Sequence, residues 1–123
     1  MIFYMALGKG KVPIIQVKIN GCSFKALVDT GSSVTYCKAK TFQTIKTENP
    51  YLNAKHTNTS GIAANGNRYK FLGETEARLE IGQTKINAGM LISDDNNCPS
   101  DLIIGTDLLQ KINEINMDIR LDF

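Results

Sequence analysis

The sequence predicts a mainly β fold with one short helix near its C-terminal end. Most of the chain consists of short segments in which apolar and polar residues alternate, which is the pattern of half-buried strands. Two Asn-Gly pairs, Asn20-Gly21 and Asn65-Gly66, lie between such segments and predict tight hairpin turns. Leu108, Leu109 and Ile112 instead have the spacing of one buried helical face.

Length and composition suit one small domain that spans residues 1–123. The apolar content of 42% is ordinary, and the formal net charge of +2 is too small to favour nucleic acid or a membrane surface as a partner. No apolar run has the length of a transmembrane helix. The apolar segment 1–7 lacks the preceding basic residues and the cleavage site of a signal peptide, so we expect none.

The cysteine and histidine content argues against a metal centre. Cys22, Cys37 and Cys98 include no C-x-x-C pair, and His56 is the single histidine. These are too few ligands for a structural zinc site, so we expect neither a metal nor another cofactor. An odd number of cysteines favours reduced thiols in a reducing compartment, which predicts an intracellular, cytoplasmic location.

The first predicted element is a hairpin over residues 12–30. Each of its strands places three apolar residues on one face: Ile15, Val17 and Ile19, then Phe24, Ala26 and Val28. The return strand ends in Ala26-Leu27-Val28, three consecutive apolar residues that are typical of a strand buried on both faces. The hairpin therefore places Asp29 at the end of a buried strand.

The middle of the chain predicts a strand over 33–37, a short helical turn or loop over 38–49, and a second hairpin over 57–72. The tip of this second hairpin consists of small residues and should move easily. Its simplest interpretation is a plain surface hairpin.

The C-terminal half predicts two more paired strands, a polar loop and a second buried strand. Their expected ranges are strands 74–81 and 84–92, loop 94–100, core strand plus helix 102–112, and terminal strand 115–123.

A carboxylate, a hydroxyl and a glycine follow the first buried strand, in Asp29-Thr30-Gly31-Ser32. An acid at the end of such a strand is costly unless it is used or satisfied, and Gly31 permits a sharp turn. The plain alternative is an ordinary turn in which Asp29 caps backbone amides. A second segment, Leu102-Ile103-Ile104-Gly105 with Thr106-Asp107-Leu108-Leu109 after it, lies about seventy residues later.

The first of these motifs resembles the active-site signature of aspartic proteases. The second resembles the apolar strand and short helix of the retroviral type of that family, the retropepsins, and the resemblance covers nearly the whole chain. Because the two motifs occur together, we favour this interpretation over an ordinary turn. Asp29-Thr30-Gly31-Ser32-Ser33 and Gly105-Thr106-Asp107-Leu108-Leu109 look nearer to gypsy-type retrotransposon enzymes.

The resemblance implies a closed, barrel-like acid protease subunit that works as a homodimer. The family's chemistry uses two facing carboxylates, whereas this chain has one Asp-Thr-Gly and no Asp-Ser-Gly. The second Asp29 would therefore come from an identical copy related by a two-fold axis. We expect the segment Ile119-Arg120-Leu121 to join an intermolecular sheet. Some relatives carry an arginine directly after the glycine of the second motif, and Thr106 here argues against a charged brace of that kind.

The resemblance also implies roles for the residues around Asp29, the expected catalytic acid. Thr30 would form a hydrogen bond across the two-fold axis, Gly31 would offer its carbonyl to the substrate backbone, and Ser32 would donate to the outer oxygen of Asp29. The second hairpin would be a flap that covers the substrate with Ile62, Ala63, Ala64, Asn65 and Gly66. Ile62 and Ile104 would line apolar pockets, with plain core packing as the alternative for both.

The expected function is that of an aspartic endopeptidase that cleaves an extended polypeptide, a retroelement polyprotein of the Gag-Pol type, in the cytoplasm or within virus-like particles. A water activated between two Asp29 carboxylates would attack the peptide bond, with a bell-shaped pH dependence that favours mildly acidic conditions. One alternative is a catalytically silent, retropepsin-like dimerisation or peptide-binding domain of a host protein. Another is a host or bacterial retropepsin with a different substrate.

Overall fold

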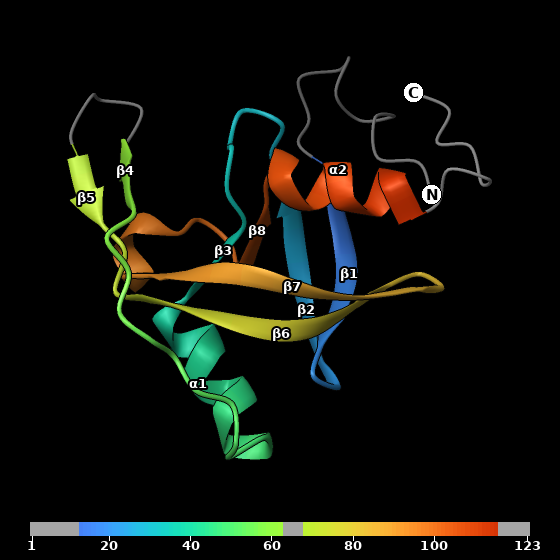
Figure 1. The fold of residues 1–123 in the computed structure, drawn as a ribbon, viewed down its shortest axis with the longest axis horizontal. Coiled ribbons are helices and arrows are strands. Elements are labelled where there is room, and N and C mark those ends of the chain that lie inside the picture. The colour runs from blue at the N-terminus through green and yellow to red at the C-terminus, as the bar shows by residue number, and fades with distance from the viewer. Residues whose placement is uncertain (1–12, 63–67, 116–123) are drawn as a thin grey trace.

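A computed structural model describes residues 13–62 and 68–115 of the chain, without the side chain of Ile115. The described residues form a closed β-barrel, a separate two-stranded sheet and two α-helices (Figure 1). The barrel strands, in barrel order, are β1 (Ile14–Ile19), β2 (Cys22–Val28), β8 (Leu102–Ile104), β3 (Tyr36–Lys38), β7 (Thr84–Ser93) and β6 (Gly73–Ile81). The predicted fold class, a mainly β barrel with a short C-terminal helix, is confirmed for these residues.

The N-terminal hairpin forms as predicted. Strands β1 and β2 pair with Ile19 opposite Cys22, so Asn20 and Gly21 form the two-residue turn. Both have positive φ, 48° and 89°, as a turn of this kind requires. The Asn20 side chain also accepts a hydrogen bond from the Arg78 amide at 2.7 Å, which ties the turn to β6.

The two sequence motifs lie on neighbouring strands of the barrel. Strand β8 runs parallel to β2, with Ala26 opposite Leu102 and Val28 opposite Ile104. All three β8 residues are fully buried, which is why this segment reads as a continuous apolar run. The pairing brings the start of the Asp29 loop beside the end of β8, although about seventy residues separate them in the sequence.

The barrel interior is filled by the alternating residues of its strands. The inward-facing residues of β6 and β7 are buried, and they include Ala77, Leu79, Ile81, Ile86, Ala88, Met90 and Ile92. Burial of a large apolar side chain contributes about 1.5–3 kcal/mol, so this interior is the main source of stability for the barrel.

Two segments differ from their predicted structure. Residues 33–35 were predicted as strand, but β3 begins only at Tyr36. The Thr35 carbonyl accepts from the Leu91 amide of β7, whereas the Thr35 amide donates to the Asp107 side chain and not to a strand. A helical turn or loop was predicted over 38–49, but the structure has a helix, α1 (Ala39–Glu48). The helix is stabilised by packing of Phe42 and Ile45 against the barrel, which local composition does not reveal.

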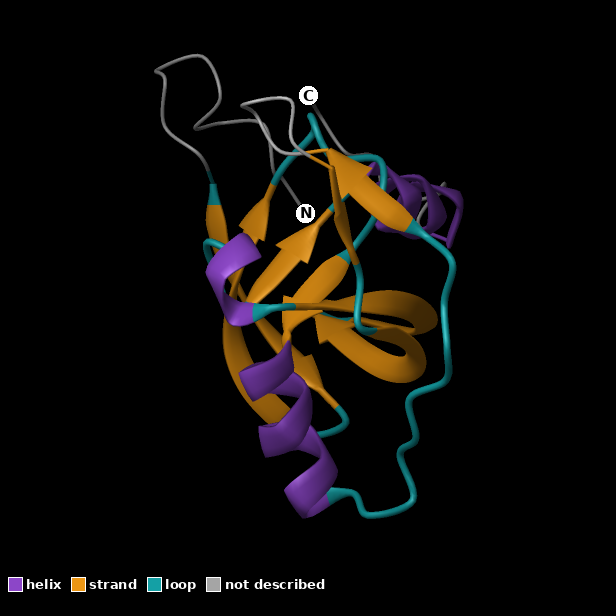
Figure 2. Ribbon diagram, turned by 90° about the vertical axis from the view of Figure 1, so that its left-hand side faces the viewer, coloured by secondary structure: helices purple, strands orange, loops and turns teal. Residues whose placement is uncertain are grey.

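A long loop leads from α1 along the outside of the barrel to the second hairpin (Figure 2). The hairpin consists of β4 (Ser60–Ile62) and β5 (Arg68–Lys70), with Gly61 opposite Tyr69. Its predicted tip, with Ala63, Ala64, Asn65 and Gly66, lies outside the described residues. The polar loop after β7 contains a 3₁₀ turn, Asp95–Asn97.

The C-terminal helix α2 (Thr106–Ile115) follows β8 directly and buries Leu108 and Ile112 against the barrel core. The predicted terminal strand begins at residue 115, and residues 116–123 lie outside the described part of the chain.

Candidate active site

Backbone hydrogen bonds hold the loop that follows β2 against the end of β8. The Asp29 amide donates to the Ile104 carbonyl at 2.9 Å, and the Thr106 amide donates to the Ser32 carbonyl at 2.9 Å. Within the loop, the Ser32 amide donates to the Asp29 carbonyl at 3.1 Å. The loop lies between the second hairpin and α2 at one end of the barrel (Figure 1). Asp29 is therefore anchored by the second motif and not only by its own strand.

The carboxylate of Asp29 is partly buried and lines a groove. Its Oδ1 atom accepts a hydrogen bond from the Gly31 amide at 2.9 Å. A Cβ atom on residue 31 would lie 3.2 Å from the same oxygen, so any other side chain would crowd the carboxylate. The glycine thus leaves space around the acid.

Ser32 does not form the predicted bond to Asp29. Its Oγ donates to the Val34 carbonyl at 2.7 Å and accepts from the Val34 amide at 3.4 Å. A serine hydroxyl in a turn readily bonds to the backbone two residues ahead, and Ser32 bonds to Val34 in this way. Thr30 is exposed in the loop, and its expected bond to a second copy stays a prediction.

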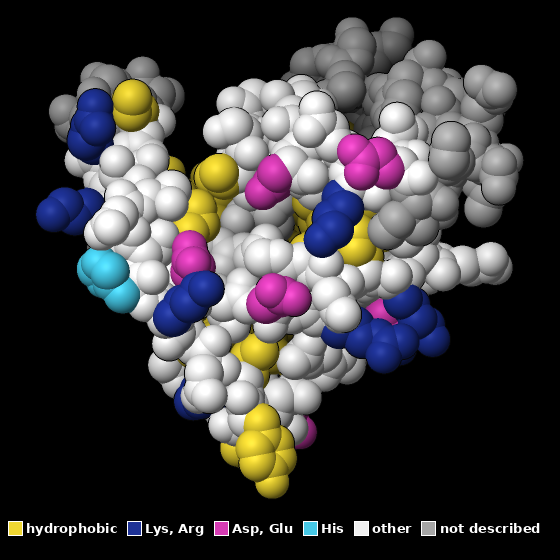
Figure 3. Space-filling model, viewed as in Figure 1, with side chains coloured by type: hydrophobic (Ala, Val, Ile, Leu, Met, Phe, Trp, Pro, Cys, Tyr) yellow, Lys and Arg dark blue, Asp and Glu magenta, His cyan; other side chains and the backbone are white. Residues whose placement is uncertain are grey.

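The groove beside Asp29 has a volume of about 910 Å³. One wall is the loop of residues 29–34, a second is the hairpin β4–β5, and a third is the segment 96–99. Figure 3 shows the hollow between the hairpin and the rest of the molecule. Ile62 lines this groove and is 67% exposed, whereas Ile104 has no exposed surface and lies in the barrel core. Ile104 thus packs in the core, which was the alternative to a pocket wall.

Three aromatic residues that sequence reasoning did not assign to the site line the groove. Tyr36 and Tyr69 each make an edge-to-face contact with Phe71, with ring centroids 5.5 and 5.4 Å apart. The Tyr69 ring also covers Gly61, where an added Cβ would lie 2.6 Å from it. The contacts join the base of the hairpin to the barrel. In the sequence, Tyr69 and Phe71 alternate with Arg68 and Lys70, and this alternation could have indicated that the two rings share one face.

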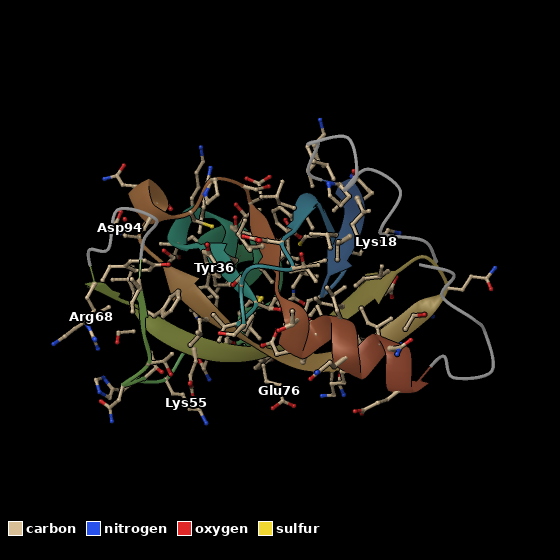
Figure 4. All side chains as sticks on the ribbon, turned by 90° about the horizontal axis from the view of Figure 1, so that it is seen from above. Lys18, Tyr36, Lys55, Arg68, Glu76 and Asp94 are labelled. Carbon is tan, nitrogen blue, oxygen red and sulfur yellow. The ribbon has the colours of Figure 1, made fainter. Side chains whose placement is uncertain are left out.

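Tyr36 lies near the middle of the molecule, between Arg68 on the hairpin side and Lys18 on the β1 side (Figure 4). Burial, followed by the proximity of Tyr69, raises the pKa of its hydroxyl well above the ordinary value, and the charge of Asp29 contributes in the same direction. The Tyr36 hydroxyl therefore keeps its proton well into the alkaline range.

Two further findings concern other classes of site. No group of three or more His, Cys, Asp or Glu residues within 13–62 and 68–115 is arranged to hold a metal ion. No helix in the same ranges is long and apolar enough to cross a membrane.

Residues 15–111 match the family described as "gag-polyprotein putative aspartyl protease". The chain belongs to this family of aspartyl proteases. The predicted resemblance is therefore confirmed at the level of retropepsin-like aspartic proteases.

Solved structures show the same fold. The chain is similar to EIAV protease in complex with the inhibitor HBY-793, with a TM-score of 0.69 and 24% identity over 84% of this chain and 89% of that chain. It is also similar to the retroviral protease-like domain of Ddi1 from Leishmania major, with a TM-score of 0.59 and 18% identity over 82% of this chain and 72% of that chain. At these identities the two matches establish the fold.

Proposed function

We propose that this chain is one subunit of a homodimeric aspartic endopeptidase with Asp29 as its catalytic residue. The observation that carries the proposal is the position of Asp29 at the wall of a large groove, on a loop bonded to the end of β8. The Ile104 carbonyl holds the backbone of Asp29, and the Gly31 amide bonds to its carboxylate, which lines the groove.

Two copies of Asp29 that face each other across a two-fold axis would share one proton. Two carboxylates in contact cannot both ionise at low cost, so the pKa of one is raised and that of the other is lowered. The ionised partner takes a proton from a bound water, which attacks the peptide carbonyl. The protonated partner donates to the carbonyl oxygen and later supplies a proton to the leaving nitrogen. The pair titrates as a unit, so activity is bell-shaped in pH.

The groove suits an extended polypeptide as substrate. The hairpin β4–β5 forms one wall and carries the exposed Ile62, so it can cover a chain that lies along the loop of Asp29. Backbone pairing of an extended segment with hairpin and loop gives affinity without a fixed sequence. Thr30 would bond across the axis, Gly31 would offer its carbonyl to the substrate, and Ala63, Ala64, Asn65 and Gly66 would form the tip of the flap.

We further propose a retroelement polyprotein as the substrate, processed in the cytoplasm or within virus-like particles. The family description names the gag polyprotein, which supports this substrate class. The three cysteines are free thiols, which fits a reducing compartment.

A catalytically silent dimerisation or peptide-binding domain of a host protein is the second candidate. Oδ1 of Asp29 accepts the Gly31 amide, as it would in a plain turn, and a similar fold occurs in a domain of Ddi1. This candidate predicts a stable dimer that binds peptides and leaves them intact.

Asp29→Asn tests the two candidates. The substitution keeps the shape of the side chain and removes the acid, so cleavage of a denatured protein at about pH 5 should be lost. The wild-type chain with and without a statine-type inhibitor is the control. Cleavage that persists in Asp29→Asn contradicts the proposed mechanism, and a verified wild-type dimer that cleaves nothing favours the silent domain.

A further inference from the structure

The carboxylate of Asp107, in the first turn of α2, accepts three hydrogen bonds. Its Oδ1 accepts from the Thr35 hydroxyl at 2.7 Å and from the Leu108 amide at 2.6 Å, and its Oδ2 accepts from the Thr35 amide at 3.2 Å. Thr35 is 1% exposed and lies 72 residues earlier in the chain. Hydrogen bonds to an ionised acceptor are about twice as strong as neutral ones, so this contact joins two distant segments firmly.

Thr35 is the end of the loop that begins at Asp29. Its hydroxyl donates to Asp107 and at the same time accepts from the Gly105 amide at 3.1 Å. The loop is therefore bonded to the end of β8 and the start of α2 at both of its ends. At the near end the bond is made by the Asp29 amide. At the far end the Asp107 side chain accepts from both the amide and the hydroxyl of Thr35, in addition to the Gly105 bond.

We infer that Asp107 is a positioning residue that sets the location of Asp29 through Thr35 and the loop between them. This inference rests on the proposed protease function. Asp107 itself does not line the groove that contains Asp29, whereas Val34, between the two bonded ends, does. Asp107 would thus affect catalysis through the position of the loop and not through contact with a substrate.

The chemistry of the contact calls for a carboxylate. Three donors converge on two oxygens, and an ionised carboxylate accepts through both. The side chain of asparagine has one oxygen and a donor NH₂, so one of the three donors would face another donor. The far end of the loop would then shift until that conflict is relieved.

A shifted loop alters the catalytic pair in a measurable way. The split between the two pKa values of facing carboxylates depends on their separation, because the repulsion falls as they move apart. A wider separation brings the two pKa values closer together, so the bell-shaped pH profile becomes narrower. A residue that only stabilised the fold would lower the fraction of active protein and leave the profile unchanged.

The test compares Asp107→Asn and Thr35→Val with Thr35→Ser, which keeps the hydroxyl, and with Glu114→Gln, which removes an exposed charge from the same helix. Active sites are counted by titration with a statine-type inhibitor, so that unfolded protein does not enter the rates. We expect kcat per titrated site to fall about 10- to 100-fold in Asp107→Asn and Thr35→Val, with little change in KM and a narrower pH profile. Thr35→Ser and Glu114→Gln should resemble wild type. The double variant that combines Asp107→Asn with Thr35→Val should lose no more kcat per titrated site than either single variant.

The outcomes separate this inference from the proposed function. A wild-type chain that cleaves no substrate overturns both. An active wild type whose Asp107→Asn variant keeps kcat per titrated site and the width of its pH profile overturns the positioning role alone. Thr35→Ser that behaves like Thr35→Val would also overturn it, because the hydroxyl would then be irrelevant.

Discussion

Asp29 combines a firmly held backbone with a carboxylate that faces open space. Its amide is bonded to Ile104, and its Oδ1 accepts the Gly31 amide, while the groove lies beside it. Ser32 forms its hydrogen bonds with Val34 instead. At this scale the family signature acts mainly through backbone geometry: aspartate supplies the acid, glycine the space around it, and serine a local turn.

The buried thiols make a prediction at the same scale. Burial raises the pKa of Cys98 to about 11 and that of Cys37 to about 12, from an ordinary value of 9.0. Between about pH 9 and 11 the unfolded chain therefore loses thiol protons that the folded chain keeps. The unfolded state then binds fewer protons, so the free energy of unfolding falls as the pH rises through this window.

Cys98→Ala should weaken that fall. Chemical denaturation at a series of pH values measures the free energy of unfolding for wild type and variant, with a reducing agent present. The two curves should run parallel below pH 8, and the variant should fall less steeply between about pH 9 and 11. Curves that stay parallel throughout would contradict the role given to the buried Cys98 thiol.

At the scale of elements, the decisive contact is that between the Asp29 loop and the corner from β8 to α2. A Cβ on Gly105 would lie 2.3 Å from the Val34 carbonyl oxygen and 2.8 Å from that of Ser32. Both are backbone atoms of the Asp29 loop, so they cannot move aside without moving the loop. The glycine of the second motif therefore permits the two motifs to pack together.

Gly105→Ala should lower the free energy of unfolding by about 2–3 kcal/mol, since the backbone must shift to admit a methyl group. Gly89→Ala is the matched control, because Gly89 is exposed in β7 and the nearest atom to its added Cβ is 4.0 Å away. Urea denaturation should find this control as stable as wild type or about 0.5 kcal/mol more stable. Equal stability of both variants would show that the close approach at Gly105 is not needed.

Among the helices and strands, those that depend on local sequence could be predicted, and those that depend on distant contacts could not. The Asn20-Gly21 hairpin and the pairing of β6 with β7 follow from local turn chemistry and alternation, and they form as expected. The length of α1 and the late start of β3 depend on contacts with distant residues, such as that of Thr35 with Asp107. The aromatic contacts of Tyr36, Tyr69 and Phe71 likewise appear only when the hairpin meets the barrel.

For the candidate site, the sequence predicted Asp29 and its neighbouring motif but not all of the partners. The apolar run at Ile104 suggested either a pocket wall or a core strand, and periodicity alone cannot separate these because both are apolar. Complete burial of Ile104 decides for the core. The resemblance assigned the Ser32 hydroxyl to Asp29, but this hydroxyl bonds to Val34 within its own turn.

At the scale of the whole molecule, the chain offers one Asp-Thr-Gly acid beside its groove, and the proposed chemistry needs two facing acids. A closed two-fold dimer would supply the second acid from an identical sequence. A shared active site of this kind can be tested without knowledge of the natural substrate.

The measurement is the activity of a fixed amount of wild-type chain that is mixed and equilibrated with increasing amounts of Asp29→Asn chain, at concentrations where both are dimeric. Each mixed dimer contains one acid, so cleavage per wild-type chain should fall steadily towards zero as the variant is added, while an equal excess of serum albumin has no such effect. Cleavage per wild-type chain that stays constant across the titration, with subunit exchange verified, would contradict the shared site.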